Sequence, residues 1–249
     1  MSKVFQAPED PYYEFFRADS AKDAQAWAAV MSYPHTRVSA TGNSPYYQTP
    51  DDYAARASWA AREATGWVRS VGVDPVRIHE SDDKVHLAGG WTRYNAKDEP
   101  ILRNRVTYIV TRLDGSWGIQ ARFGTDSFTE GEVLDSSAPL GVVAAHLENW
   151  AAGDLGAATE TLVYPFTKVG VGRVDRYGNA SEVANKLHAD PPGTVEDVQP
   201  VREGRDGIVA AATWRSAQGA AFQAVFLVAR RKAGWCMAAA SIIGPRCDG

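Results

Sequence analysis

The sequence has few features that would point to a membrane, a disulfide framework or nucleic acid. It has only two cysteines, and Cys236 lies in an apolar, strand-like run, which favours a buried reduced thiol over a disulfide with Cys247. No apolar run approaches the roughly 18 residues of a membrane span, and the first ten residues lack the apolar core of a signal peptide. The net charge of −4 argues against general binding to nucleic acid or anionic membranes. We therefore expect a cytoplasmic protein with no nucleic-acid or membrane partner.

Motifs for metals and cofactors are also missing. There is no His-x-His, His-Glu-x-x-His or Cys-x-x-Cys spacing, although His79 and His86 are expected on neighbouring strands. Gly170-x-Gly172 lacks the third glycine and the acidic residue of a dinucleotide site, and no Gly-x-Ser-x-Gly motif occurs. We therefore expect no metal and no organic cofactor. Any chemistry should then be proton transfer in a pocket that contains little water.

What the sequence does contain is a long internal repeat. The hexapeptide Tyr-Pro-His-Thr-Arg-Val at 33–38 returns 131 residues later as Tyr-Pro-Phe-Thr-Lys-Val at 164–169. This period is too long for a solenoid, whose units have roughly 20–50 residues, and each copy is large enough to be a domain. We predict one domain at 1–126, a linker at 127–137 and a second domain at 138–249. The two domains should pair pseudo-symmetrically, and a homo-oligomer is an open alternative.

Each copy has helix signals first and strand signals afterwards. In the first copy, Asp10-Pro11 begins a helix that Pro34 should end, a strand follows at 35–41, and Thr49-Pro50 begins a helix that should reach about Gly66. Strand-like segments follow at 67–79, 84–94, 101–113 and 116–124, and the second copy repeats this order. The order predicts an α+β fold with helices on one face of a curved antiparallel sheet.

This order resembles the nuclear transport factor 2-like superfamily, which includes ketosteroid isomerases and SnoaL-like polyketide cyclases. Val-Val-Ala-Ala-His at 142–146, followed by Ala-Gly-Asp-Leu at 152–155, is similar to the first helix and turn of the isomerases. Residues 107–117 are similar to the last hairpin of the superfamily. The resemblance implies two tandem cone-shaped α+β barrels of the cystatin-like type. It does not by itself imply a reaction, because one fold supports many functions.

The resemblance does not extend to the catalytic residues of the isomerases. The position of their oxyanion-hole tyrosine carries Phe15 in the first copy and His146 in the second. Their general-base aspartate falls on or next to Ala40, and their second acid falls near Ile109. A ketosteroid isomerase is therefore not expected.

His35 and Arg37 are the first candidates for chemistry. They are two residues apart on an expected strand, so their side chains share one face. A histidine titrates near neutrality and an arginine can hold an anion or enolate, so the two could act as an acid/base and electrostatic pair. The other face carries Val38 and Ala40. If that apolar face forms the core, His35 and Arg37 lie in the contact between the domains instead.

Two further features widen the candidate site. Tyr46 and Tyr47 lie in a loop that either closes over the mouth of the cone or forms an aromatic plug. Arg105 is either a buried charge that needs an anionic ligand or part of a solvated face. The catalytic candidates are His35, Arg37, Tyr46, Tyr47 and His146. The substrate-binding candidates are Phe15, Tyr33, Trp59, Arg105, Ile109 and Tyr177.

The first copy, which also keeps Arg122, is favoured as the working pocket, and His146 keeps the opposite assignment open. The leading hypothesis is a cofactor-independent acid/base lyase acting on a hydrophobic, aromatic small molecule, as in the catabolism of aromatic compounds. Elimination, dehydration and retro-aldol-type release, such as release of formaldehyde, are the reactions that the resemblance suggests. The alternatives are an isomerase or cyclase of the SnoaL-like type and a non-catalytic ligand-binding or assembly module. A hydrophobic cavity of roughly 300–1,000 Å³ would favour an enzyme.

Overall fold

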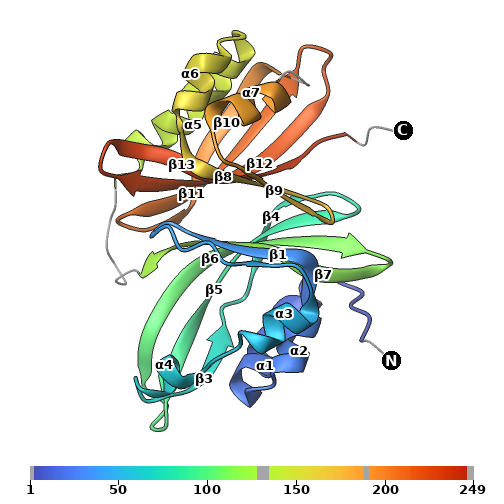
Figure 1. Cartoon of the computed structure of the whole chain (residues 1–249), viewed down its shortest axis with the longest axis vertical. Helices are drawn as coiled ribbons and strands as arrows, with labels where there is room; N and C mark the ends of the chain where they lie inside the picture. Colours follow the sequence, from blue (N-terminus) through green and yellow to red (C-terminus); the bar gives the residue numbers. More distant parts are fainter. Residues whose placement is uncertain (1–2, 128–134, 188–190, 246–249) are drawn as a thin grey trace.

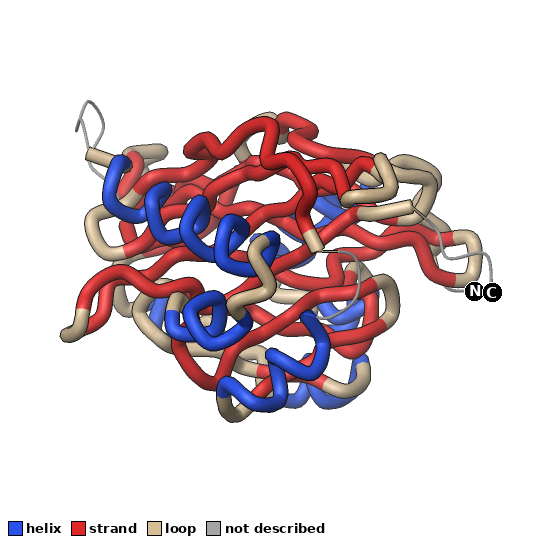
Figure 2. The backbone as a smooth tube through the Cα atoms, turned by 90° about the horizontal axis from the view of Figure 1, so that it is seen from above, coloured by secondary structure: helices blue, strands red, loops and turns tan. Residues whose placement is uncertain are grey.

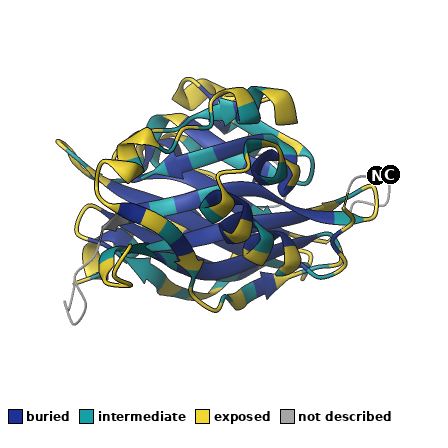
Figure 3. Cartoon of the chain, turned by 90° about the horizontal axis from the view of Figure 1, so that it is seen from below, coloured by how far each residue is buried: buried dark blue, intermediate teal, exposed yellow. Residues whose placement is uncertain are grey.

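The computed structural model describes residues 3–127, 135–187 and 191–245, and it contains two sheets that face each other with helices outside each one (Figure 1). Seen from above, helices cross the strands of the second sheet (Figure 2). Seen from below, strands that are largely buried lie beneath more exposed helices (Figure 3). The order of layers is therefore helix, sheet, sheet, helix. No helix of the described part is both long and apolar enough to cross a membrane.

The first half contains four helices and seven strands in its described residues. The helices are α1 (Asp10–Ala21), α2 (Ala24–Ala29), α3 (Pro50–Ala55) and α4 (Ala60–Glu63). The strands are β1 (Met31–Ser39), β2 (Tyr46–Tyr47), β3 (Trp67–Gly72), β4 (Val76–Glu80), β5 (Lys84–Asn95), β6 (Pro100–Leu113) and β7 (Ser116–Ser127). They form one sheet in the order β2-β1-β7-β6-β5-β3, and β4 extends the β3 edge by also pairing with β5.

The described part of the second half repeats this arrangement. Its helices are α5 (Ser137–Ala151), α6 (Leu155–Glu160) and α7 (Ala180–Leu187). Its strands are β8 (Leu162–Gly170), β9 (Arg173–Tyr177), β10 (Pro192–Glu203), β11 (Gly207–Ser216), β12 (Ala221–Arg231) and β13 (Gly234–Ile243). Reading β9-β8-β13-β12-β11-β10 gives the same order as the first sheet, with β8 parallel to β13 as β1 is to β7. The expected fold class is confirmed, and both sheets are open rather than closed into barrels.

Local sequence explains where several helices begin. The carboxylate of Asp23 accepts a hydrogen bond from the amide of Ala26, and the Thr49 hydroxyl accepts one from Asp52, so each caps the first turn of a helix. The expected capping box also forms, because Asn179 accepts from the amide of Glu182 at 3.1 Å. These caps fix the starts of α2, α3 and α7.

Three expected element boundaries were wrong. Pro34 lies inside β1 and does not end the helix, because a register shift between Met31 and Thr36 accommodates a residue that cannot donate a hydrogen bond. The strand expected at 67–79 is two strands interrupted before Pro75. The helix expected to reach Gly66 is divided into α3 and α4. The linker expected at 127–137 falls mostly on 128–134, outside the described residues.

An apolar contact joins the two sheets. Its buried side chains come from both of them: Val38, Ala40, Ile109, Ala121, Phe123, Val169, Val209, Val225, Leu227, Ala229, Ala238 and Ala239. The backbones come so close that a Cβ atom on Gly207 would lie 2.2 Å from the Cβ of Ala40, so this position requires glycine. The apolar face of β1 therefore packs between the domains. The alternative that placed His35 and Arg37 in this contact was wrong.

Buried polar groups supplement this contact. Lys84 is 5 % exposed, and its Nζ donates to the carbonyl oxygens of Ile242 at 2.8 Å and Val169 at 3.2 Å. The Nε2 atom of His86 is 2.9 Å from the Ser241 hydroxyl. Buried polar groups need hydrogen-bond partners, and a different position of the first sheet against the second would leave these groups without theirs. The bonds therefore help to specify the relative position of the two sheets.

Helix α1 is fastened to the first sheet by Tyr12, and this gives a stability prediction. Its hydroxyl lies 2.5 Å from the carbonyl oxygen of Val73 and 2.7 Å from that of Gly90. Tyr12→Phe should lower the free energy of unfolding by about 1–3 kcal/mol, because it removes a buried hydroxyl that donates to one of these carbonyl oxygens and accepts from the Gly90 amide at 3.3 Å. Urea unfolding measures this. The matched control is Tyr13→Phe, at a residue that is 50 % exposed, and equal losses in both variants would contradict the assignment.

Candidate functional site

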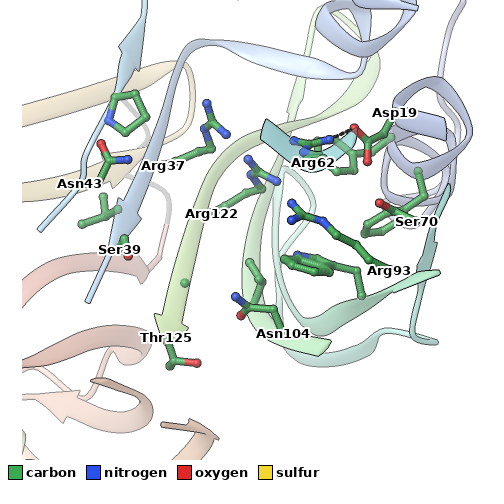
Figure 4. Close-up of a pocket in the computed structure, with 17 residues that line it drawn as sticks. Asp19, Arg37, Ser39, Asn43, Arg62, Ser70, Arg93, Asn104, Arg122 and Thr125 are labelled. Carbon is green, nitrogen blue, oxygen red and sulfur yellow. Dashed lines mark hydrogen bonds and ion pairs between the residues drawn. The ribbon is translucent and has the colours of Figure 1, made fainter. Parts of the chain in front are cut away.

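A cavity of about 250 Å³ lies in the first half, between α1 and the sheet that it covers (Figure 4). Its polar lining residues are Asp19, Arg37, Ser39, Asn43, Arg62, Ser70, Arg93, Asn104, Arg122 and Thr125. Its apolar lining comes chiefly from Phe15, Phe16, Trp91 and Val106. Asn43 is exposed, so the cavity opens beside the loop that joins β1 to β2. The lining differs from the hydrophobic cavity that we expected, because four arginines surround it.

The four arginines come from four different elements. Arg37 on β1 and Arg122 on β7 are direct partners in the register of two neighbouring parallel strands. Arg93 lies on β5 and Arg62 on α4, and the four side chains extend toward a common space (Figure 4). The sheet and the helices therefore bring together residues that are far apart in sequence.

Aromatic rings support each guanidinium group. The Cζ atom of Arg93 lies 4.4 Å from the ring centre of Trp91, and that of Arg122 lies 4.8 Å from the ring centre of Phe15. The same distance is 5.5 Å from Arg37 to Tyr47. Such cation–π contacts are worth roughly 0.5–2 kcal/mol each, and they restrict the planes of the guanidinium groups before any ligand arrives.

Asp19 is the only acidic residue among the described lining residues. It is 3 % exposed and forms an ion pair with Arg62. Its Oδ1 atom also accepts a hydrogen bond from the indole nitrogen of Trp59 at 3.0 Å. Because both bonds go to Oδ1, the second carboxylate oxygen is the one that can face a ligand.

Arg37, Arg93 and Arg122 form no ion pair with any acidic side chain that the structure describes, and the buried Nε atom of each lacks a hydrogen-bond partner. Burial, together with the nearby charge of Arg62, lowers the pKa of Arg93 to about 10. Burial also lowers the pKa of Arg122, and the neighbouring Arg37 adds to this. Like charges directly opposite on adjacent strands destabilise a sheet. The cavity therefore holds positive charge that the described protein residues do not neutralise.

His35 lies beside this cavity without lining it. The buried ring donates from Nδ1 to the carbonyl oxygen of Ile119 at 2.8 Å, which leaves Nε2 unprotonated in the neutral ring and without a partner. Burial, followed by the charge of Arg122, lowers the pKa of His35 well below its usual value. His35 is therefore neutral near pH 7 and adds no charge to the site.

The structure places some of the other expected site residues near the cavity. Phe15 lines it directly, and the Tyr47 hydroxyl accepts a hydrogen bond from Arg37. Trp59 donates the hydrogen bond from its indole nitrogen to Asp19. Tyr33 packs against the core of the first half and donates to the carbonyl oxygen of Ala28 at 2.9 Å, and Tyr46 donates to Gln48 at 2.8 Å.

The remaining expected residues lie elsewhere. Ile109 belongs to the contact between the sheets. Arg105 lines a separate groove together with Arg202. His146 and Tyr177 lie in the second half, around a cavity of only about 30 Å³. Aromatic and aliphatic side chains nearly fill this second cone.

Of the lining residues, only Phe15 and Arg37 were sequence-based candidates, and the polar residues missed include Asp19, Arg62, Arg93 and Asn104. Arg122 was noted as a feature of the first copy, without a role. A signal for Arg122 existed in the sequence, because it lies between Ala121 and Phe123 on a strand, and a charge at such a position faces away from the apolar neighbours. No comparable pattern marks Arg62, which lies on a helix of only four residues.

No group of three histidine, cysteine, aspartate or glutamate side chains that could hold a metal ion occurs among the described residues. What the site offers is one carboxylate, several guanidinium groups and aromatic rings. This set can bind an anion, orient an aromatic group and accept a proton.

The strand order, and the position of the cavity between helix and sheet, define a tandem protein of the cystatin-like, nuclear transport factor 2-like fold, with an arginine-lined cavity in its first half. No family model and no curated protein matches the sequence. A cystatin-like domain of unknown function from Nostoc punctiforme PCC 73102 is 15% identical, with 48% of this chain and 75% of that chain covered, at a TM-score of 0.41.

Two other solved structures are similar to about half of the chain. An NTF2-like protein with a cystatin-like fold from Novosphingobium aromaticivorans is 16% identical, with 46% of this chain and 83% of that chain covered, at a TM-score of 0.37. A ketosteroid isomerase-like protein from Erwinia carotovora atroseptica SCRI1043 is 20% identical, with 48% and 99% covered, at a TM-score of 0.34. These likenesses concern the fold and carry no argument about activity.

Proposed function

We propose that the first half of the chain binds a small organic anion in the arginine-lined cavity. The observation that carries this proposal is that Arg37, Arg93 and Arg122 reach one cavity, and none of them has an acidic partner in the described part of the chain. Leaving a buried charge without its partner costs about 3–5 kcal/mol in typical proteins. An anion in the cavity would provide the missing negative charge, and a guanidinium group binds a carboxylate or phosphate through two parallel hydrogen bonds.

The apolar part of the lining restricts what else the ligand carries. Phe15, Phe16 and Trp91 provide ring surfaces on the helix and sheet sides of the cavity. The volume of about 250 Å³ is below the roughly 300–1,000 Å³ of pockets for drug-sized molecules. A ligand with about one aromatic ring and an anionic group would match both properties. The proposed ligand is thus still aromatic, as expected from the sequence, but it also carries a negative charge.

Asp19 favours a second, finer proposal, which is cofactor-independent acid/base chemistry on the bound anion. In an elimination, the Asp19 carboxylate would accept a proton from the carbon next to a carbonyl group. The electron pair would form an enolate whose oxygen an arginine stabilises, and a leaving group on the next carbon would then depart to form a double bond. An isomerase would begin with the same proton transfer. We therefore propose elimination, begun by this proton transfer, as the reaction of the lyase hypothesis.

Calorimetric titration tests the binding proposal. Benzoate, phenylacetate and cinnamate should bind and neutral benzamide should not, with affinity falling as sodium chloride is added. Arg93→Met should weaken binding at least tenfold, since it removes a cation from the cavity. The exposed Arg176, on β9 of the second half, provides the matched control Arg176→Met. Equal binding of benzamide and benzoate would overturn the proposal.

Proton exchange tests the chemical proposal separately. In D2O, nuclear magnetic resonance should detect deuterium entering the carbon next to the carboxylate of a bound arylacetate or arylpropionate. Asp19→Asn should abolish this exchange, because an amide cannot accept the proton. Binding without any exchange would instead favour the non-catalytic binding module.

A further inference from the structure

We propose that the natural ligand of this cavity is a dianion, which carries two negative charges next to an aromatic or apolar body. The proposal rests on the anion-binding function above and extends it. Arg62 is neutralised by Asp19, so three cationic side chains remain, and no other described acidic residue lines the cavity. One negative charge would leave two partly buried cations uncompensated, whereas two charges leave only one.

The neighbouring histidine does not change this count. His35 lies next to Arg37 and Arg122 on the same side of the sheet, and its Nδ1 proton is used by the Ile119 carbonyl. A neutral imidazole contributes neither a counter-charge nor an additional cation. The other lining side chains that lie near the arginines are Asn104, Ser39, Ser70 and Thr125, which are uncharged. Charge balance therefore depends on the ligand.

The placement of the arginines also favours two points of attachment. Arg37 and Arg122 are side by side on β1 and β7, whereas Arg93 lies on β5, on the far side of β6. Arg93 is paired with Leu102 of β6, whereas Arg122 is paired with Tyr108 of β6, so the backbones that carry them are separated by two strand spacings, about 10 Å, and by roughly 20 Å of strand length. In Figure 4 their side chains extend toward each other across the cavity. An anion between Arg37 and Arg122 therefore leaves Arg93 available for a second charge or a second oxygen of the same group.

Two chemical sources could supply such a dianion, namely an aromatic dicarboxylate and an aromatic phosphomonoester. Both present oxygen atoms that match the paired donors of arginine. The shared property is the double charge, and the test below separates the two sources by comparing them directly.

The test uses ligand pairs that have the same ring and differ in charge. Phenyl phosphate, a dianion above its second pKa of about 6, is compared with phenyl sulfate, a monoanion. Phthalate is compared with its monomethyl ester. In calorimetric titrations of the full chain at pH 7.5, at least one dianion should bind tenfold or more tightly than its monoanionic partner. The tighter of the two dianions identifies the source.

Variants then show whether the arginines produce the preference. Arg93→Met and Arg37→Met should each reduce the ratio of dianion to monoanion affinity toward one, while Arg176→Met should leave the ratio unchanged. If monoanions bind as tightly as dianions in both pairs, the dianion proposal is overturned and the anion-binding function stands. If no member of either pair binds, and benzoate does not bind either, both proposals fail.

Discussion

Arg122→Met should raise the unfolding temperature of the ligand-free protein and, at the same time, weaken anion binding severely. Arg122 is partly buried in the first half, with its Nε atom fully buried and no acidic partner among the residues that the structure describes, and burial lowers its pKa. Replacing buried charges by apolar side chains of similar volume can stabilise a protein by roughly 1–4 kcal/mol. For a chain of this size, each kcal/mol should raise the unfolding temperature by about 2–4 °C. Methionine is flexible enough to pack against Phe15 in place of the guanidinium group.

The same substitution should weaken binding of benzoate or phenyl phosphate by about 2 kcal/mol or more, which is roughly thirtyfold. Opposite signs for stability and affinity are expected of a functional charge, whereas a purely structural residue would lose stability when replaced. Differential scanning calorimetry without ligand and titration with ligand measure the two effects. Arg122→Lys, which keeps the charge and loses the paired donors, should give an intermediate affinity. A destabilised Arg122→Met protein with unchanged affinity would contradict the assignment.

The two copies show how one cone could become a binding site and the other a filled core. The register pairs Arg37 with Arg122 in the first half and Lys168 with Ala240 in the second, so alanine stands where the first copy has its deepest arginine. The offset of 131 residues places Asp19 on Trp150, which lines the small second cavity. The second copy thus has a ring in place of the carboxylate. This contrast favours the first copy as the working one.

Much of the fold could be predicted because the repeat supplied the same information twice. Helix caps, turn residues and strand-like runs recur in the same order in both copies, so an ambiguous segment in one copy could be interpreted from the other. The errors occurred where tertiary structure overrode a local sequence signal. Pro34 would end an isolated helix, but in the folded chain a bulge between β1 and β7 accommodates it.

The site could be predicted only in part, because both faces of each sheet are covered. A strand with one solvated face reveals its core side by alternation. On β1, Val38 faces the other sheet and Arg37 faces the cavity, so neither face of the strand is exposed to solvent. The sequence pattern alone therefore did not show which face of β1 lines the cavity. Arg37 and Phe15 were identified from the strand pattern and from the resemblance. Arg62 and Arg93 required the tertiary structure, because their elements meet only across the cone.

Acidification should destabilise the protein strongly between about pH 6.5 and pH 4, before most carboxylates are protonated. Burial lowers the pKa of His79 and of His146 to about 4, and it lowers that of His35 and His86 well below the usual value. In the unfolded chain these side chains bind protons below about pH 6.5. The unfolded state therefore binds more protons in this range, so stability decreases as the pH falls. A shift to about 4 corresponds to about 2 kcal/mol per histidine at pH 5.

Urea unfolding at pH 7.5, 6.5, 5.5 and 5.0 measures this dependence, and the slope of stability against pH is the informative quantity. Each buried histidine should contribute up to about 1.4 kcal/mol per pH unit, because the slope counts the extra protons bound by the unfolded chain. His146→Gln should therefore reduce the slope by about that amount, even if its stability at pH 7.5 is lower. In the folded protein the Nδ1 atom of His146 donates to the carbonyl oxygen of Ala158 at 2.8 Å, a bond that glutamine can replace without acquiring a charge. An unchanged slope in this variant would show that His146 is protonated in the folded protein and that the acid sensitivity arises elsewhere.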